Sequence, residues 1–207
     1  ASMSERFPDG LYSGLTIVPN PWLKSETAWS HELGINLNPS PFIYLDIAGF
    51  WNDYWDMIEP KPDPNQVIQF INVTRARIAG VETNLKVLAF KNFGFDIGYT
   101  WMDPYDIELD TTLAYRPRHI LTSGLTFTIS KLELGADFRY VSKFDRVEVY
   151  PNDDRVDQQI LDLRAAYTFG QLRLGFNVNN VFNYNYTQME RTLMPIRHYV
   201  VTLGTRL

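Results

Sequence analysis

The chain has 207 residues, a formal charge of −5 and no cysteine. Its length suits one large domain or part of a larger protein. The absence of cysteine excludes thiol chemistry and disulfides, and an acidic balance without a basic cluster argues against nucleic acid as a partner. Hydrophobic residues make up 45% and aromatic residues 14% of the chain, yet the mean hydropathy is −0.22. No stretch approaches the roughly 18 apolar residues of a membrane-spanning helix.

Segments of alternating polarity run along most of the chain. From Phe93 to Trp101 every odd position is large and apolar, and every even position is glycine, acidic or hydroxylic. The same period of two returns over residues 132–140 and 172–179. Strand side chains alternate between faces, so each segment predicts a strand with one apolar and one polar face. A soluble sandwich seldom fills its polar face with so many glycines, whereas an outer-membrane barrel turns its apolar face to lipid. The sequence therefore predicts an all-β fold, a transmembrane antiparallel β-barrel.

This alternation assigns side chains to the two faces of the barrel wall. The residues expected to face lipid are Leu132, Leu134, Phe138, Leu172, Leu174 and Phe176. The residues expected to face the lumen include Asp137, Arg139, Arg173 and Asn177. Charges of both signs across a lumen usually form cross-strand pairs.

In chain order, the alternating runs between turn signals predict about nine strands. They lie near residues 26–38, 41–57, 68–89, 93–105, 117–130, 131–147, 155–169, 170–183 and 196–207. Tight joints at 38–41, 91–92, 130–131 and 170–171 alternate with longer segments at 58–67, 103–116, 148–154 and 184–195. Residues 1–25 read as one more long loop. Membrane barrels have short periplasmic turns and long extracellular loops, so the C-terminus is expected on the periplasmic side.

Aromatic residues cluster near the two ends of the predicted strands. The outer cluster contains Trp29, Trp51, Trp101, Tyr140 and Tyr199, and the opposite cluster contains Phe93, Tyr167 and Phe169. Aromatic girdles at both membrane interfaces are typical of such barrels. The alternative interpretation is that these rings fill the core of a soluble sheet.

Three segments resemble motifs of one family. Asn-Pro-Trp-Leu-Lys-Ser-Glu-Thr at 20–27 is followed by Glu-Leu-Gly at 32–34; Ala-Arg-Ile-Ala-Gly-Val-Glu occupies 76–82; and Asn-Val-Phe-Asn at 180–183 is followed by Tyr186. In this order and spacing they resemble the C-terminal part of the barrel of a TonB-dependent outer-membrane receptor, and the resemblance covers essentially the whole chain. One departure is the last residue, which is usually Phe in the family and is Leu207 here, expected to close a strand on its lipid face.

The resemblance implies a barrel of roughly 22 strands, of which this chain supplies the C-terminal ones. Residues 1–25 are then an extracellular loop and residues 26–207 barrel strands. The plug domain and the segment that engages a TonB-type energy-coupling protein are expected to lie outside this chain. The expected location is the bacterial outer membrane. The implied function is energised uptake of a scarce, bulky ligand such as a ferric siderophore, with oligosaccharide or cobalamin as variants.

Ligand contacts are expected in the long loops, where aromatic and acidic residues mix. Such side chains suit stacking on a sugar or a catechol and hydrogen bonding to its hydroxyls, and an arginine could meet an anionic group. The candidate ligand-binding residues are Tyr54, Trp55, Asp103, Tyr105 and Arg191. The alternative for each ring is a role as an anchor at the membrane rim. The expected partners are outer-membrane lipid, the rest of the barrel and its plug, the energy-coupling protein and the small ligand.

Catalysis is not expected. The sequence has no hydrolase or metalloprotease motif, and its histidines, His31, His119 and His198, are dispersed. A barrel phospholipase would need Ser123 beside His119, which the sequence leaves open. Asp153 and Asp154 are too few ligands for calcium, so no metal or cofactor is expected. The other function class left open is a passive porin-like or structural barrel, with an outer-membrane enzyme a distant third.

Overall fold

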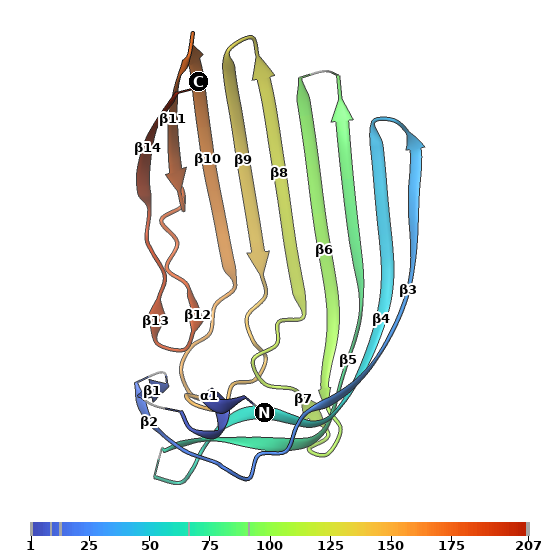
Figure 1. Ribbon diagram of the computed structural model, residues 1–207, viewed down its shortest axis with the longest axis vertical. Coiled ribbons are helices and arrows are strands. Elements are labelled where there is room, and N and C mark those ends of the chain that lie inside the picture. The colour runs from blue at the N-terminus through green and yellow to red at the C-terminus, as the bar shows by residue number, and fades with distance from the viewer. Residues whose placement is uncertain (1, 9, 13, 66, 91, 206–207) are drawn as a thin grey trace.

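The computed structural model describes residues 2–8, 10–12, 14–65, 67–90 and 92–205. Within these residues the chain forms a large curved sheet whose neighbouring long strands are antiparallel (Figure 1). The long strands are β3 (Thr27–Ser40), β4 (Ile43–Pro62), β5 (Ile68–Ala89), β6 (Phe93–Asp106), β8 (His119–Ile129), β9 (Leu132–Val141), β10 (Gln158–Phe169), β11 (Leu172–Asn179) and β14 (His198–Thr205). The short elements are α1 (Met3–Arg6), β1 (Leu11–Tyr12), β2 (Leu15–Val18), β7 (Thr111–Thr112), β12 (Thr187–Met189) and β13 (Thr192–Leu193). No helix in the described part of the chain is long and apolar enough to cross a membrane.

Each long strand pairs with the long strands before and after it in the sequence. The outermost strands, β3 and β14, each pair with a single neighbour among the described residues, so the sheet is open. Tight turns join the strands at one end of the sheet and long connections join them at the other (Figure 1). The turn expected at 91–92 includes Lys91, which lies outside the described residues, as does Leu207 at the C-terminus.

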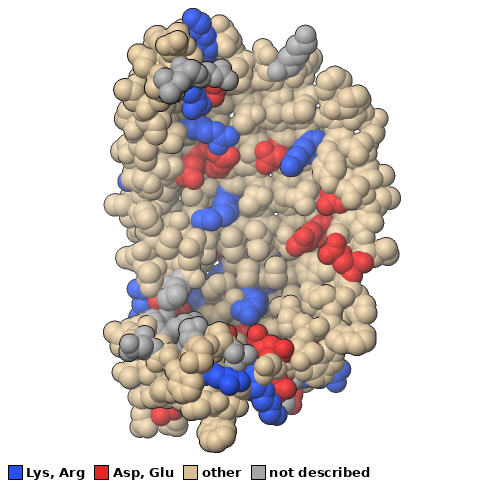
Figure 2. All heavy atoms as spheres, in the orientation of Figure 1, with Lys and Arg blue, Asp and Glu red and all other residues tan. Residues whose placement is uncertain are grey.

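The two faces of the sheet differ in polarity as the alternation predicts. The register places Phe127, Leu134, Ala165 and Phe176 in one row across four strands. Figure 2 views the concave face, where Lys, Arg, Asp and Glu gather in the hollow. The expected lipid-facing residues lie on the opposite, convex face. Their exposed fractions are 42% for Leu134, 50% for Leu172, 46% for Leu174 and 45% for Phe176, and among the described residues the other sheet is only the two-stranded β12–β13 pair.

Glycines make room on the concave face for long charged side chains. A Cβ at Gly135 would lie 2.3 Å from Nε of Arg164, because that side chain crosses the glycine to form an ion pair with Asp137. Farther toward the tight turns, Nη2 of Arg173 lies 2.5 Å from Oε2 of Glu133. The mixed charges of this face therefore form the cross-strand pairs expected of a polar wall.

The strand count and several strand ends differ from the prediction. The described residues form fourteen strands rather than about nine, because short strands form within segments expected as loops. β9 ends at Val141 instead of near 147. β11 ends at Asn179 instead of near 183, because the next residue, Asn180, has φ 51° and turns the chain. β4 instead extends to Pro62, beyond the expected end near 57.

Two prolines made residues 58–67 read as a loop. Pro60 and Pro62 pair with Phe70 and Ile68 of β5, whereas the pairing of β4 with β3 ends at Trp55. Beyond Trp55, the side of β4 that faces away from β5 therefore has no strand partner among the described residues and is a sheet edge. A proline without a backbone N–H is tolerated at such an edge because no ladder bond is lost.

Residues 2–25 form more than the expected loop. They contain α1, β1 and β2, and β2 pairs in parallel with β5. Leu23 is 2% exposed, Lys24 N donates to Asn72 Oδ1 at 2.9 Å, and Ile58 N donates to Glu26 Oε1 at 2.6 Å. The motif around Leu23 therefore fastens this segment to the β4–β5 hairpin, whose tip lies across the end of the sheet (Figure 1).

Candidate functional site at the loop end

Tyr115 is the centre of a network that ties the long connections together. Its hydroxyl accepts hydrogen bonds from Glu148 N and Val149 N at 2.9 and 2.8 Å and donates to Glu190 Oε2 at 3.0 Å. The other oxygen of Glu190 accepts from Tyr150 N at 2.8 Å. Burial raises the pKa of the Tyr115 phenol, so the hydroxyl keeps its proton. These bonds join the connections that follow β7, β9 and β12, which gives the loop end a defined shape.

Arg191 lies beside this network, in a cavity of about 270 Å³ between the connection after β9 and the connection after β11. Its Nε and Nη2 donate to the two carboxylate oxygens of Asp153 at 2.7 and 3.0 Å, and its guanidinium carbon lies 3.6 Å from the centre of the Tyr150 ring. The hydrogen bonds from Arg191 lower the pKa of Asp153. The same cavity is lined by Tyr186, Gln158 and Lys143, so it combines aromatic faces with hydrogen-bonding groups.

Two buried carboxylates pair with arginines of the connections at the loop end. Glu59 is 7% exposed and pairs with Arg116 at 2.9 Å. Burial raises the pKa of Glu59, and the guanidinium of Arg116 opposes this shift only in part. Asp106 is 2% exposed, and its side chain lies 3.9 Å from Nη1 of Arg146. The first pair ties the β4–β5 hairpin to the connection after β7, and the second ties the end of β6 to the connection after β9.

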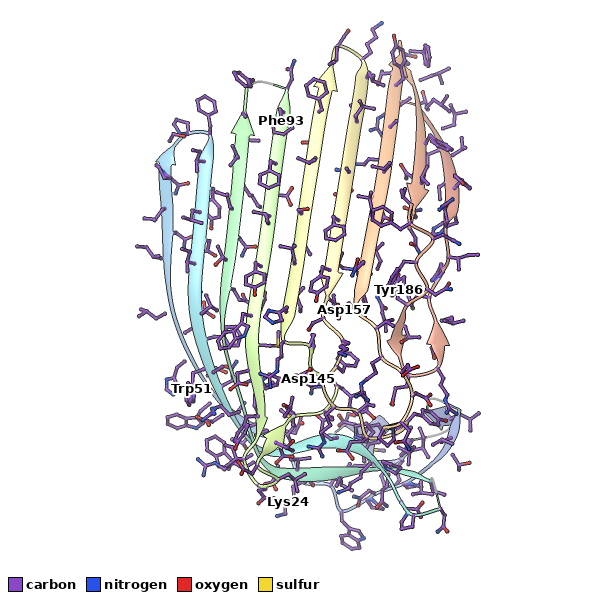
Figure 3. The ribbon with its side chains drawn as sticks, turned by 180° about the vertical axis from the view of Figure 1, so that it is seen from behind. Lys24, Trp51, Phe93, Asp145, Asp157 and Tyr186 are labelled. Atoms are coloured by element: carbon purple, nitrogen blue, oxygen red, sulfur yellow. The ribbon has the colours of Figure 1, made fainter. Side chains whose placement is uncertain are left out.

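Arg118 links strand β6 to the connection that follows β9. Arg118 Nη1 lies 2.8 Å from Asp103 Oδ1, and its Nε lies 2.5 Å from Asp145 Oδ2. Figure 3 labels Asp145 and Asp157 at this end of the sheet. Asp157 accepts hydrogen bonds from Tyr140 and from Lys143 N at 3.2 and 2.9 Å. These contacts join β6, the end of β9 and the connection after β9 at the loop end.

The predicted ligand-binding residues do not converge on one point. Tyr54 packs against the buried cluster of Met57, Ala76 and Leu113. Trp55, its neighbour in the strand, points to the other face, where Arg75 lies 5.9 Å from the ring centre. Tyr105 lies on that same convex face under Arg77, at 5.3 Å, and its hydroxyl donates to Asp110.

Asp103 lies on the convex face with Trp55 and Tyr105. Arg191 lies apart from them, in the loop cavity. Alternation along β4 explains this division: adjacent strand residues cannot face the same way. Sequence reasoning missed Tyr115, Glu190, Glu59 and Arg116, which the chain brings together from distant segments. Asn180 was identified as part of a motif, and its side chain binds Tyr184 N and O at 2.8 Å, which fixes the start of the last connection.

The histidines are engaged separately from one another. His119 Nδ1 lies 2.8 Å from the Tyr99 hydroxyl, and His198 Nε2 lies 3.0 Å from Asn179 Nδ2. Ser123 shares strand β8 with His119 but lies about 13 Å along it, at ~3.3 Å per residue, so the two do not form a catalytic pair. Within the described ranges no three His, Cys, Asp or Glu side chains group to hold a metal ion.

Comparison with known proteins identifies the family. A family model described as the beta-barrel of TonB dependent receptor-like proteins matches residues 1–181. The chain belongs to this family. The chain is 30% identical over 170 residues to the vitamin B12 transporter BtuB of Vibrio vulnificus (strain YJ016), a match that covers 81% of this chain and 27% of that protein.

Solved structures share the fold at lower identity. The copper transporter OprC matches with a TM-score of 0.75 at 20% identity, over 89% of this chain and 32% of that one. A ferric enterobactin receptor, PfeA of Pseudomonas aeruginosa, matches with a TM-score of 0.70 at 23% identity, over 93% of this chain and 34% of that one. The chain thus spans about a third or less of the proteins it matches.

Membership of the TonB-dependent receptor family places the chain in the outer membrane of a Gram-negative bacterium, as predicted. The relatives are receptors and transporters, so the prediction that the protein is not an enzyme is confirmed. The convex apolar face is then the lipid face and the concave charged face is the lumenal one.

Proposed function

We propose that the chain is the C-terminal part of the barrel of a receptor that imports a scarce, bulky ligand with energy from a TonB-type protein. A ferric siderophore is the leading ligand class, with cobalamin and oligosaccharide as variants. Family membership supports the proposal, as do relatives whose names include a vitamin B12 transporter and a ferric enterobactin receptor. Residues 1–25 are the outer loop segment and residues 26–207 the strand-bearing part. The plug and the energy-coupling segment belong to the rest of the receptor.

The observation that carries the proposal is the lumenal wall. Charged side chains in ion pairs, such as Arg173 with Glu133, line the concave face, and this polar lining suits contact with a plug inside a wide barrel. A passive porin also has a polar lumen. It differs because solute would cross it without an energy-coupling partner.

The loop end is the proposed ligand entrance. Arg191, Tyr54, Trp55, Asp103 and Tyr105 remain the proposed ligand contacts, and their geometry divides them into two sets. Arg191 lines the loop cavity and Tyr54 lies against the inner cluster. The other three lie on the convex side, but beyond the Trp51 and Trp101 belt toward the loop end, where a ligand can reach them from outside the membrane. We expect an anionic group of the ligand to replace Asp153 as the partner of Arg191, because a carboxylate and a ligand anion can each bind a guanidinium through two hydrogen bonds.

A pair of double variants of the full receptor tests this site. Tyr54→Ala with Arg191→Ala removes the inner set, and Trp55→Ala with Tyr105→Ala removes the aromatic members of the convex set. Each should weaken ligand binding while leaving normal levels of heat-modifiable, folded barrel. Unchanged affinity in both would move the site to the plug or to the N-terminal half of the barrel.

The function itself is tested by growth. A strain that lacks the receptor gene should fail to grow when a siderophore-bound iron source or cobalamin is limiting, and the full gene should restore growth. Expressed alone with a signal peptide, residues 1–207 should not restore it, because an open sheet leaves backbone groups unpaired in lipid. Ligand uptake by this segment alone would contradict the proposal.

A further inference from the structure

Arg77 occupies an unusual place on the lipid face of the sheet. The register aligns Trp29, Asp53, Arg77 and Tyr105 in one row across four strands. The guanidinium carbon of Arg77 lies 4.7 Å from the ring centre of Trp51 and 5.3 Å from that of Tyr105. Alternation in β5 points Arg77 away from the lumenal Gly80 and Glu82. The side chain therefore lies between aromatic rings on the outside of the barrel.

The carboxylates nearest to Arg77 on this face are bound to other donors. Asp53, its direct cross-strand neighbour, accepts from Trp51 Nε1 at 2.8 Å. Asp103, one row away, pairs with Arg118 at 2.8 Å. Among the described residues no ion pair involves Arg77, and its buried Nε has no hydrogen-bond partner. A guanidinium with unused donors is thus held at the outer surface, with exposed Arg75 beside it.

A hollow of about 550 Å³ lies directly beside Arg77 on the membrane side. Its walls include Trp51 and Trp101, which are 45% and 40% exposed, and its floor is low because Gly49 and Ala79 stand between these rings. A Cβ at Gly49 would meet nothing closer than a carbonyl oxygen at 3.9 Å. Close packing therefore does not require a glycine at this position. The lining of the hollow also includes His31, Glu32, Arg77 and Asp103. The apolar part of the hollow, which contains Trp51, Trp101 and Leu33, suits an acyl chain.

The depth of this arrangement matches a membrane interface. Below the hollow the lipid face becomes aliphatic, as in the row of Leu37, Leu45, Leu85 and Ile97. Tryptophan and tyrosine belts mark the level of the headgroups, and Arg77 stands just beyond the Trp51 and Trp101 belt. Lipid phosphates lie at that level, and arginine is the preferred bidentate partner of phosphate.

We propose that Arg77, supported by Arg75, binds the phosphorylated headgroup of an outer-leaflet lipid whose acyl chain lies in the hollow between Trp51 and Trp101. Charge complementarity and position select this occupant, because the site faces lipid and not the lumen through which the imported ligand passes. The Trp51 and Tyr105 rings hold the guanidinium flat and extended toward the headgroup.

The test uses the intact receptor in detergent, titrated with lipid A that carries its phosphates and with the same lipid after dephosphorylation, with bound lipid counted by native mass spectrometry. One interfacial arginine contributes about a five-fold change in affinity. Wild-type receptor should prefer the phosphorylated lipid by about that factor, and Arg77→Gln should abolish the preference. Lys131→Gln, which removes one positive charge at the opposite, turn end of the sheet, should retain it.

Gly49→Leu tests the acyl-chain half of the site. It should fill the hollow and weaken both lipids equally while the phosphate preference persists. Equal affinity of the wild-type receptor for the two lipids would overturn the proposal without any variant. So would an equal loss of preference in Lys131→Gln, or displacement of the lipid by excess inorganic phosphate, which would indicate an anion site that does not recognise lipid.

Discussion

The hydroxyl of Tyr115 donates a hydrogen bond to Glu190, 75 residues later in the chain, at 3.0 Å. The same oxygen accepts two backbone N–H groups of the connection after β9. One phenol thus joins the parts of the loop end that surround the proposed ligand entrance. The organisation of this end depends on long-range side-chain contacts rather than on strand pairing.

Replacing Tyr115 with Phe should loosen the loop end without unfolding the barrel. The change leaves the N–H groups of Glu148 and Val149 without their acceptor, at a cost of about 1–3 kcal/mol for unsatisfied buried donors. Hydrogen exchange at residues 147–150 should accelerate, and affinity for the imported ligand should fall. Tyr167→Phe, at the opposite aromatic belt, is the matched control. Unaltered exchange in Tyr115→Phe would contradict the role assigned to this hydroxyl.

The lipid face should tolerate charge according to depth. Leu163 lies in the row with Leu125 and Ala136, midway between the aromatic belts, whereas Leu172 is paired with Phe169 beside the tight turn. Leu163→Arg should cost roughly 2–4 kcal/mol and Leu172→Arg about 0–1 kcal/mol, because the penalty for arginine falls from the midplane to the interface. Folded barrel can be measured by heat-modifiable migration in gels. Equal damage from the two variants would argue against the membrane placement.

Gly80 in the Ala-Arg-Ile-Ala-Gly-Val-Glu motif should not accept a side chain. A Cβ there would lie 2.2 Å from the carbonyl oxygen of Trp101 and 2.6 Å from the Phe50 ring. The oxygen belongs to the backbone of β6, so it moves only if the strand pairing is distorted. Gly80→Ala should reduce the yield of assembled receptor, whereas Gly49→Ala should have little effect. Normal assembly of Gly80→Ala would show that this contact is not needed.

The Glu59 carboxyl should make the closure of the loop end depend on pH. Its pKa is raised in the folded protein, so its stabilising contribution is fully present below the ordinary glutamate pKa of about 4.3 and is lost as pH rises through the folded pKa. Protease cleavage within 57–67 should therefore be slower at a pH near the ordinary glutamate pKa than at a pH above the raised pKa of Glu59 in the folded protein. Glu59→Gln, which is neutral throughout, should remove the dependence. A dependence retained in that variant would assign it to another group.

Local sequence pattern was sufficient to predict the wall of the barrel. Alternation over 132–140 and 172–179 fixes which side chains share a face, and the convex and concave faces of the sheet follow it. The same rule places Tyr54 and Trp55 on opposite faces, because they are adjacent residues of one strand. The rest of the candidate site lacked such a signal because Tyr115, Glu190, Glu59 and Arg116 meet only through tertiary contacts.

The predicted boundaries of loops and strands were wrong for a related reason. Pro60 and Pro62 are turn signals in an isolated sequence, yet in the fold they occupy an edge where the missing N–H costs nothing. Residues 2–25 read as a loop because their strand partner, β5, lies about 50 residues away in sequence. Edge status and parallel pairing are properties of the assembled sheet.

Dependence on an energy-coupling partner separates the proposed import from passive flow, and it can be measured by comparing ligand binding with ligand uptake in cells that carry the full receptor. In cells without the TonB-type partner, radiolabelled ligand should still bind to the cell surface with unchanged affinity, while accumulation inside the cells should be lost. Accumulation that continues at the same rate without that partner would contradict energised import and identify the barrel as a passive pore.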